Sequence, residues 1–401
     1  MTPFRIVTPA AMIGMMFMAS TLVSPLYMLY QQAFGFSDVT LTLIYAVYVL
    51  GNLVALLFFG RLSDQIGRKP AAWWAIVVAV ASTLLFLLAQ GTAWLYVARA
   101  LSGFAIGIAS GSATAWLIEL LGGEQARQAS LITTTANFSG LGLGSLLAGF
   151  LAQYEPWPLQ LSYLVYLAAL VPLALLVRAT PETVRQRRGL RQVSLRPRLG
   201  VPASVRRRFI APAAAALGTF SFIGFYAALA PSLVRERLHI ENHALGGAIV
   251  AELFIVSALA MIATRRLASA SAMRWGLVLM LPSLVLLVLA SARGSLLLLG
   301  ADTAVVGLCA ALAYRGSLQV ANQLAPAAQR AEIASSYFVA CFVGNSLPVI
   351  GIGWLSVALG SVAAISIFAA IIAAVAVGAL VSLEYALPPR SAHVQGSSPQ
   401  R

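Results

Sequence analysis

The chain has 401 residues, of which 60% are apolar and 9% are charged, and its mean hydropathy is +0.88. A soluble protein of this length needs more polar residues to cover its surface, so the composition excludes a soluble domain and indicates a polytopic membrane protein. The net charge of +14 does not indicate nucleic-acid binding, because most basic residues lie in short segments between apolar runs. Cys309 and Cys341 both lie inside apolar runs and are expected to be core residues rather than a disulfide or a metal site.

Three apolar runs open the chain, at residues 9–30, 39–59 and 71–89. A helix that rises about 1.5 Å per residue needs roughly 20 residues to cross roughly 30 Å of hydrocarbon, so each run can form one span. The first run is too long for a cleavable signal peptide and lacks a small-residue cleavage site. Nine further spans, which make twelve in all, are expected at residues 94–118, 128–152, 159–178, 209–231, 245–264, 273–292, 295–318, 333–357 and 361–385.

An even number of spans places both termini on one side of the membrane, and the basic residues predict which side. With the N-terminus in the cytoplasm, all but four of the 26 Lys and Arg residues are also cytoplasmic. Arg235, Arg237 and Arg293 then lie outside, and Arg99 lies within a span. Because cytoplasmic loops carry an excess of Lys and Arg, we expect a multi-pass protein of the bacterial inner membrane with both termini in the cytoplasm.

The longest polar segment, residues 178–208, separates six spans from six and contains ten arginines but only one acid, Glu182. We expect it to lie against the anionic inner leaflet, and a regulatory or partner-binding segment is the alternative. The segments EQARQASLITTTANFSG and AQRAEIASSYFVACFVG, after the fourth and tenth spans, are weakly similar, as two related bundles would be. The expected units are an N-terminal six-helix bundle (1–178), a basic cytoplasmic linker (179–208), a C-terminal six-helix bundle (209–386) and a disordered tail (387–401).

The turn between the second and third spans has the sequence GRLSDQIGRKP, in which the notable residues are Gly60, Asp64, Gly67, Arg68 and Lys69. Glycine permits a tight reversal or a close helix approach, and the carboxylate can meet an arginine or a helix N-terminus. The spacing resembles the loop signature of the major facilitator superfamily, except that Gln65 stands where that family usually has a basic residue. An ordinary basic turn would explain the charges but not the glycines and the aspartate together.

The resemblance covers about residues 8 to 386 and implies an all-α fold of twelve transmembrane helices in two pseudo-symmetric six-helix bundles. It also implies a monomer with a substrate site near the bilayer midplane, between the bundles. Glu119, at the cytoplasmic end of the fourth span, matches the acid that meets the arginines of the signature loop in this family. We therefore expect a latch of Asp64, Arg68 and Glu119 that holds the outward-open state, and three solvated loop charges are the alternative.

A charge inside a span costs about 2.5–3.5 kcal/mol on insertion scales, so each one needs a reason. Arg99, in RALSGFAIG, resembles a second family signature, in which the buried arginine is associated with proton coupling. Glu252 lies at a depth that suits a proton acceptor, and Asp302 lies at a similar depth two spans later. The hypothesis is that these three residues include the proton-coupling groups. The alternatives are an Arg99 that snorkels to the outer interface and acids that pair with Arg293 or with polar groups near the outer face.

The fifth span carries glycines at positions 140, 142, 144 and 149. They look like a degraded form of the glycine-proline signature typical of exporter branches of the family, with Leu141 at the proline position and Ser145 at the last glycine. Because glycines permit close helix packing whatever the direction of transport, this pattern leaves the direction open.

The substrate cavity is expected to hold apolar and amphipathic side chains from four spans: Met15, Met18, Tyr27, Asn137, Phe138, Tyr226 and Asn345. Met15 and Met18 are three residues apart and share a helix face. Flexible thioethers suit a cavity for varied apolar ligands, although they are more often used to fill a core or to face lipid.

These features predict a secondary active transporter of a small organic solute, with proton-coupled efflux of lipophilic or cationic compounds as the favoured function. Proton-coupled uptake of a metabolite is the alternative, and a membrane-embedded enzyme is a different class. The sequence contains no nucleotide-binding motif and no cluster of metal ligands, and His239 and His243 fall in an outer loop. We expect no enzyme activity, cofactor, metal or nucleic acid, and the expected partners are the substrate, the proton and the lipid bilayer.

Overall fold

The structure is a computed structural model that describes residues 4–386 except 61, 123–125, 185–198 and 327–328. Within these residues every regular element is a helix, and twelve helices are long and apolar enough to cross a membrane. The predicted all-α fold with twelve spans is therefore confirmed. The expected disordered tail and the middle of the expected linker lie outside the described residues.

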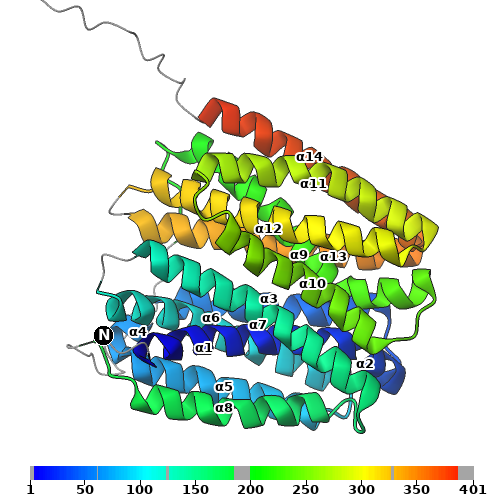
Figure 1. Ribbon diagram of the computed structural model, residues 1–401, viewed down its shortest axis with the longest axis horizontal. Helices are drawn as coiled ribbons and strands as arrows, with labels where there is room; N and C mark the ends of the chain where they lie inside the picture. The colour runs from blue at the N-terminus through cyan, green and yellow to red at the C-terminus, as the bar shows by residue number, and fades with distance from the viewer. Residues whose placement is uncertain (1–3, 61, 123–125, 185–198, 327–328, 387–401) are drawn as a thin grey trace, which may run out of the picture.

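The first six spans form the N-terminal half, drawn from blue to green in Figure 1. Pro25 interrupts the first span, because it has no backbone N–H to continue the helical ladder, and the chain tightens there into the 3-10 turn η1 (Ser24–Leu26). The helices of this half are α1 (Phe4–Leu22), α2 (Tyr27–Phe34), α3 (Asp38–Phe59), α4 (Leu62–Ile66), α5 (Arg68–Leu87), α6 (Thr92–Leu120), α7 (Ala126–Tyr154) and α8 (Leu161–Ala179).

The last six spans form the C-terminal half. Its first helix extends seven residues beyond the predicted end at 231, so Pro231 lies inside the helix. The ring of Pro231 packs against Gly246, where the absence of a side chain leaves room for it. The helices of this half are α9 (Arg206–Leu238), α10 (His243–Ala263), α11 (Ser269–Arg293), α12 (Leu296–Leu324), α13 (Arg330–Leu359) and α14 (Ser361–Ala386).

Each half has its own buried core. The core of the N-terminal half contains Trp116 and Tyr163, and that of the C-terminal half contains Phe222 and Tyr337. The halves meet along two helix pairs, α7 with α10 and α3 with α13. In Figure 1 the N-terminus and α4 lie at the left end of the bundle, which we call the linker end because the linker also starts there, and the right end is the opposite end.

At the opposite end, α7 and α10 touch through their backbones. A Cβ atom on Gly247 would lie 2.5 Å from the carbonyl oxygen of Ser145, and one on Gly149 would lie 2.8 Å from that of His243. The hydroxyl of Ser145 donates to the carbonyl of Gly247 at 3.1 Å, and the backbone N–H of His243 donates to Oε1 of Gln153 at 2.8 Å. These five residues, the α7–α10 seam, hold the two halves together at the opposite end.

All four glycines of the fifth span lie in helix contacts. Cβ atoms at positions 140 and 144 would lie 2.1 and 2.2 Å from the carbonyl oxygens of Gly14 and Met18 in α1, while positions 142 and 149 face α10. Helix α7 is therefore held closely between the two halves. Close packing accounts for these glycines without any reference to the direction of transport.

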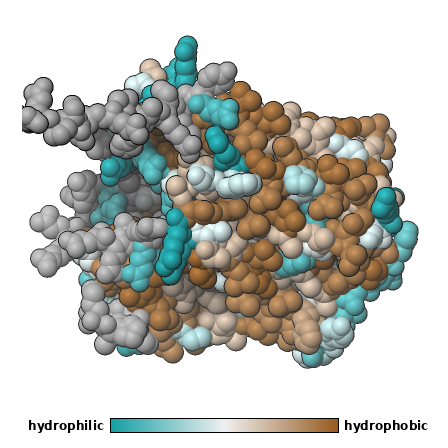
Figure 2. Space-filling model, turned by 45° about the horizontal axis from the view of Figure 1, so that its top comes forward, coloured by the Kyte–Doolittle hydropathy of each residue, from teal (hydrophilic) through white to brown (hydrophobic). Residues whose placement is uncertain are grey.

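A belt of apolar side chains covers the middle of the face shown in Figure 2, and polar side chains gather toward its ends. Large apolar side chains are exposed around the bundle, including Leu297, Val357 and Trp354, which are 84%, 68% and 66% accessible. An apolar surface of this extent would aggregate in water and is what a protein presents to lipid. The chain is therefore a multi-pass membrane protein.

The contact between α3 and α6 gives a direct test of the helix packing. A Cβ atom on Gly103 would lie 1.8 Å from the carbonyl oxygen of Tyr48, so G103V must push the two helices apart. We expect it to lower the free energy of unfolding by about 3 kcal/mol. Thermal unfolding of the purified protein in detergent measures the loss, with G378V as the control because nothing lies within 4 Å of a Cβ at that position. Equal melting temperatures for the two variants would contradict the packing.

Candidate functional site

A buried cation lies in the middle of the N-terminal half. Arg99 of α6 is 0% exposed, and its Nη1 donates to the carbonyl oxygen of Ser20 at 2.8 Å. The rings of Tyr27, Tyr45 and Tyr48 surround the guanidinium, with centroids 5.6, 5.5 and 4.8 Å from its central carbon. This tyrosine cage stabilises the charge through the ring faces, and its enclosure excludes the snorkelling alternative.

Some polar atoms in the cage around Arg99 lack a hydrogen-bond partner. The Nε and Nη2 atoms of Arg99 are buried and make no hydrogen bond within the described residues, and the same holds for the hydroxyl of Tyr27. Buried donors without acceptors are costly, so a site that retains them is a candidate for binding a group that the chain itself does not supply.

The tyrosine cage is linked to the C-terminal half through Asn345 of α13. The hydroxyl of Tyr45 donates to Oδ1 of Asn345 at 3.2 Å, and Nδ2 of Asn345 donates to the hydroxyl of Tyr48 at 2.8 Å. The structure thus places Tyr27 and Asn345, both expected in the cavity, on either side of the contact between the halves. Sequence analysis missed Tyr45 and Tyr48, although their spacing of three residues puts them on one face of α3.

A buried acid lies in the C-terminal half, away from this cage. Asp302 of α12 is 0% exposed, and its two oxygens accept hydrogen bonds from the hydroxyl of Tyr226 in α9 at 2.5 Å and from that of Ser283 in α11 at 2.6 Å. Within the described residues Asp302 makes no ion pair, either with Arg99 or with Arg293. Its carboxyl group is therefore held by two hydroxyls alone.

The three residues expected to couple protons do not form one cluster. Arg99 belongs to the N-terminal half and Asp302 to the C-terminal half. Glu252 is half-buried in α10 beside Gly300 of α12, and the exposed Ile255 follows it three residues later on the same face. The structure therefore places Glu252 near the α12 segment that carries Asp302, on a flank of the helix rather than in the tyrosine cage.

The remaining residues expected in the cavity differ in burial and in the half of the protein that they contact. Met15 and Met18 are half-buried in α1, and Oδ1 of Asn137 in α7 is buried without a hydrogen bond within the described residues. Phe138 crosses the contact between the halves, and its ring lies 6.2 Å from that of Phe254 and 6.1 Å from that of Tyr314. Phe138 thus packs into the core of the C-terminal half.

At the linker end, the signature turn forms a cluster of ion pairs around Arg68. Its Nη1 atom lies 2.5 Å from Asp64 and 2.7 Å from the hydroxyl of Ser63, while Nη2 and Nε contact the two oxygens of Glu119 at 2.5 and 3.1 Å. Gly67, at a φ of 109°, makes the left-handed turn that brings the arginine back over α4. The structure brings Asp64, Arg68 and Glu119 together, and the arginine is buried, so these are not three solvated charges.

The start of the linker is tied to the same cluster. Glu182 accepts hydrogen bonds from the backbone N–H groups of Arg68 and Lys69 at 2.9 and 3.1 Å, which are the first residues of α5. Lys69 in turn donates to the carbonyl of Arg178 at 2.8 Å, and the Thr183 hydroxyl donates to Glu119. A carboxylate at a helix N-terminus satisfies exposed donors and complements the helix dipole. Glu182 is therefore, like Tyr45 and Tyr48, a residue of the candidate site that was not predicted from the sequence.

The hydrogen bonds and ion pairs described for this cluster lie within the N-terminal half and the start of the linker. They are complete in a structure whose opposite end is closed by the α7–α10 seam. The role expected for this cluster, a latch that holds the outward-open state, stays a prediction.

Two cavities lie where the halves meet. At the linker end a cavity of about 630 Å³ is lined by Arg265, Arg266 and Arg315 of the C-terminal half and by Gln128 and Thr134 of α7. At the opposite end the space is only about 40 Å³. Of these two spaces, the larger therefore lies at the linker end, between α7 of one half and α10 and α12 of the other.

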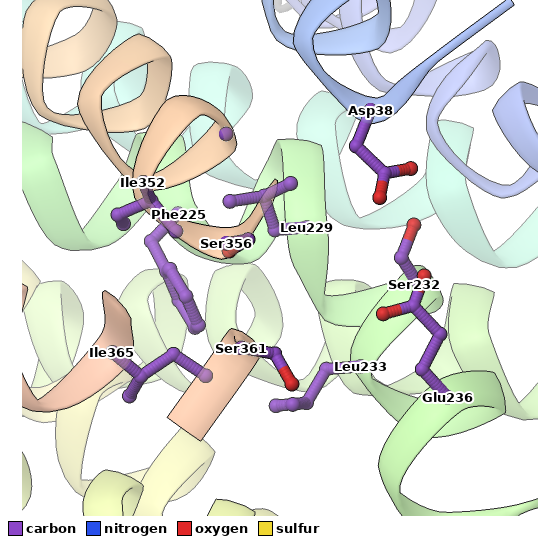
Figure 3. Close-up of a pocket in the computed structure, with 11 residues that line it drawn as sticks. Asp38, Phe225, Leu229, Ser232, Leu233, Glu236, Ile352, Ser356, Ser361 and Ile365 are labelled. Carbon is purple, nitrogen blue, oxygen red and sulfur yellow. The ribbon is translucent and has the colours of Figure 1, made fainter. Parts of the chain in front are cut away.

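Figure 3 shows the smaller pocket at the opposite end, in which the carboxylate of Asp38 on α3 points toward the hydroxyl of Ser232 on α9. Glu236 lies one turn further along α9 and lines the same pocket, with the apolar Ile352 and Ile365 on its other side. This pocket is too small for an organic substrate, whereas the volume of the cavity at the linker end lies within the range of small-molecule sites.

The tie between Glu182 and α5 generates a test. E182A removes the acceptor of two backbone N–H groups, so we expect faster amide hydrogen exchange at the start of α5 and a loss of about 1 kcal/mol in stability. Hydrogen exchange with mass spectrometry measures the change, and E241A, in the loop before α10, is the control. Unchanged exchange at residues 68–72 in E182A would contradict the tie.

Comparison with known proteins agrees with this architecture. The chain is 24% identical to "Multidrug resistance protein MdtL" of Klebsiella pneumoniae (strain 342) over 372 residues, which are 90% of each chain. It is 37% identical to the human "Solute carrier family 2, facilitated glucose transporter member 10" over 95 residues, 24% of this chain and 18% of that one. It is also 28% identical to "Sugar transporter ESL1" of Arabidopsis thaliana over 76 residues, 19% and 16% of the two chains. The family model of the Major Facilitator Superfamily matches residues 10–349, most of the chain, and the protein therefore belongs to this superfamily of transporters.

Proposed function

We propose that the protein is a proton-coupled secondary transporter that exports lipophilic organic compounds from the cytoplasm by alternating access. The working unit is a single chain whose two halves rock about a site near the bilayer midplane. The linker end faces the cytoplasm of a bacterial inner membrane, because the basic residues are concentrated there. Both termini then lie in the cytoplasm.

The enclosure of Asp302 is the observation that carries the coupling. A carboxyl group inside a membrane protein is costly to maintain and is usually functional. Asp302 is held by Tyr226 and Ser283 from two neighbouring helices, so it is oriented without being neutralised by a cation. A carboxyl group that is enclosed in one conformation and reaches water in the other binds and releases a proton as the halves move, and this exchange links transport to the pH gradient.

Arg99 supplies the fixed positive charge of the other half. It is linked through Tyr45 and Tyr48 to Asn345, so movement of α13 away from α3 must break these two hydrogen bonds. The cage therefore responds to the separation of the halves, while Asp302 responds to protons. In this arrangement the cage of Arg99 in the N-terminal half responds to movement of α13, and Asp302 in the C-terminal half binds the proton. The substrate site lies between the two halves.

The direction of transport is supported by the relative that is named a multidrug resistance protein and aligns with 90% of this chain. The open hollow at the linker end also gives a compound in the cytoplasm access to the space between the halves. Uptake of a metabolite with protons is the second candidate, and the shorter matches to a glucose transporter and a sugar transporter favour it.

Transport into everted membrane vesicles tests both proposals. With an acidic lumen, an exporter accumulates a fluorescent xanthene dye, whereas an importer accumulates it only in right-side-out vesicles with the opposite gradient. We expect gradient-driven accumulation in everted vesicles, and we expect D302N to reduce it by at least about tenfold because the carboxamide cannot exchange the proton.

The matched control is E384Q, which removes a carboxylate that is largely exposed at the end of α14. It should leave accumulation unchanged. Accumulation by D302N at the rate of the unsubstituted protein, with equal amounts of protein in the membrane, would contradict the role of Asp302. Accumulation that ignores the pH gradient in the unsubstituted protein would contradict proton coupling itself.

A further inference from the structure

A small pocket at the opposite end brings together two carboxylates from different halves. Asp38 begins α3 in the N-terminal half, and Glu236 lies near the end of α9 in the C-terminal half. Both line the space of about 40 Å³ shown in Figure 3, which we call the acidic pocket. Their negative charges act on each other, and neither makes an ion pair within the described residues. Two like charges that share a space repel each other unless a cation compensates them.

The neighbouring helices place no positive charge inside the pocket. Arg235 and Arg237 flank Glu236 in the chain and weaken its charge from outside, but neither of them lines the pocket. The Nε of Arg237 donates to the carbonyl oxygen of Ser291 in α11 at 3.2 Å, so this side chain is directed elsewhere. Helices α13 and α14 contribute no charged residue to the lining. The lining itself therefore has two negative charges and no positive one.

A buried hydroxyl is directed into the acidic pocket. Ser232 of α9 is 7% exposed, and the carboxylate of Asp38 points toward its hydroxyl (Figure 3). Serines inside helices often donate to the carbonyl four residues earlier, as Ser221 does in the same helix at 2.7 Å. The hydroxyl of Ser232 makes no hydrogen bond within the described residues, although the side chain is almost fully enclosed. It is therefore free to contact a ligand in the pocket.

The other polar groups at the pocket also present oxygen atoms. Ser356 of α13 and Ser361 of α14 line it, and their hydroxyls too make no hydrogen bond in the part of the chain that the structure describes. Beside it, Gln31 of α2 donates to Oδ1 of Asp38 at 2.7 Å, while its own Oε1 is buried and accepts no hydrogen bond from the described residues. Carboxylate, hydroxyl and carbonyl oxygens are the ligands that hard cations such as Ca²⁺ prefer.

The size of the acidic pocket suits an ion. A space of about 40 Å³ is too small for an organic molecule, but it exceeds the roughly 10–15 Å³ that one water needs, so an ion fits with some of its water. The described residues contain no group of three or more His, Cys, Asp or Glu side chains that could hold a metal. Hydroxyl groups and water must therefore complete the coordination of a cation here, and its binding depends on both carboxylates.

The pocket depends on the contact between the halves. One turn beyond Asp38 on α3, Thr42 packs so closely against α13 that a Cβ atom on Gly353 would lie 2.7 Å from its hydroxyl oxygen. Movement of α3 away from α9 and α13 therefore separates Asp38 from Ser232 and Glu236. A cation that contacts both carboxylates binds the conformation in which this end is closed, and it shifts the population toward that conformation.

We propose that the acidic pocket binds a divalent cation, for which Ca²⁺ is the probe, between Asp38 of one half and Glu236 of the other, and that the bound cation holds the opposite end closed. The charge of the ion matches that of the two carboxylates, and the hydroxyl of Ser232 adds a neutral oxygen ligand. This inference goes beyond the proposed transport function, because the cation is a ligand of one conformation and is not the coupling ion.

Equilibrium binding of radioactive Ca²⁺ tests the site directly. The purified full-length protein is stripped with a chelator in an uncharged detergent, and Ca²⁺ is added up to about 10 mM in a constant background of salt. We expect one saturable site with a Kd of about 0.1–1 mM, the range of exposed sites with few carboxylates. Mg²⁺ should compete weakly, because it gives up its water less readily than Ca²⁺ does.

The variants D38N and E236Q each replace one carboxylate by an amide of nearly the same shape. We expect either change to raise the Kd of Ca²⁺ by about tenfold or more, because affinity follows the number of charged ligands. The matched control is E241Q, which removes an exposed carboxylate at the same end that does not line the pocket, and its Kd should stay within about twofold. S232A retains both carboxylates and should raise the Kd by about threefold.

A second measurement reports the conformation. With spin labels at positions 155 and 241, which lie at the opposite end on different halves, Ca²⁺ should increase the fraction of molecules with the short distance. The D38N variant should not show this increase. The response separates a cation that bridges the halves from one that is bound by a single half.

The inference is overturned if Ca²⁺ does not bind, if D38N and E236Q bind it as E241Q does, or if bound Ca²⁺ leaves the spin-label distances unchanged. It is also overturned if acid alone, without any bound cation, produces the short distance, because protons then neutralise the two carboxylates. None of these results alters dye accumulation driven by a pH gradient in everted vesicles. Failure of the cation site is therefore distinguishable from failure of the proposed transport function.

Discussion

The backbone contact between α7 and α10 at the opposite end is the constraint on which the arrangement of the two halves depends. Gly149 and Gly247 let the helices approach so closely that neither position has room for a Cβ atom. Ser145 and Gln153 make hydrogen bonds with backbone groups of α10 across this contact. The close approach of the helices therefore does not leave these groups without a partner. The cavity of about 630 Å³ lies at the linker end, beyond this contact, and is lined by residues of α7, α12 and the end of α10.

The two charged groups that are fully enclosed are divided between the halves. Arg99 is stabilised by tyrosine faces and Asp302 by two hydroxyls, and neither has an ion-pair partner within the described residues. A direct pair would neutralise both charges and hold the halves together through a strong contact. With separate enclosures, each charge can respond on its own, one to the opening of the contact at Asn345 and the other to protons.

Composition was sufficient to predict the twelve spans, and the spacing of four residues placed Asp64 beside Arg68, because both are local properties of the chain. The pairing of Arg68 with Glu119 was expected from the family resemblance, since these residues are 51 positions apart. Glu182 was out of reach for a physical reason: its partners are backbone N–H groups 113 and 114 residues away, and only folding brings them together. Asn345 was expected in the cavity, but its hydrogen bond with Tyr45 was out of reach for the same reason, because the two residues are 300 positions apart. The proton-coupling residues were assigned by depth within a span, and depth does not distinguish two halves or two faces of a helix, so the separation of Arg99, Asp302 and Glu252 was not predictable. Helix α9 continues beyond the predicted end at residue 231, and Pro231 lies within it beside Gly246, whose missing side chain leaves room for the ring.

In the proposed transport cycle the halves pivot, so that the seam at the opposite end opens when the cavity at the linker end closes. Spin-label distances measured by electron paramagnetic resonance test it most directly, with one pair at Glu155 and Glu241 on the opposite end and another at Gln128 and Arg274 on the linker end. When the pH is changed or a dye is added, we expect one distance to lengthen as the other shortens. Two distances that stay constant, or that lengthen together, would contradict it.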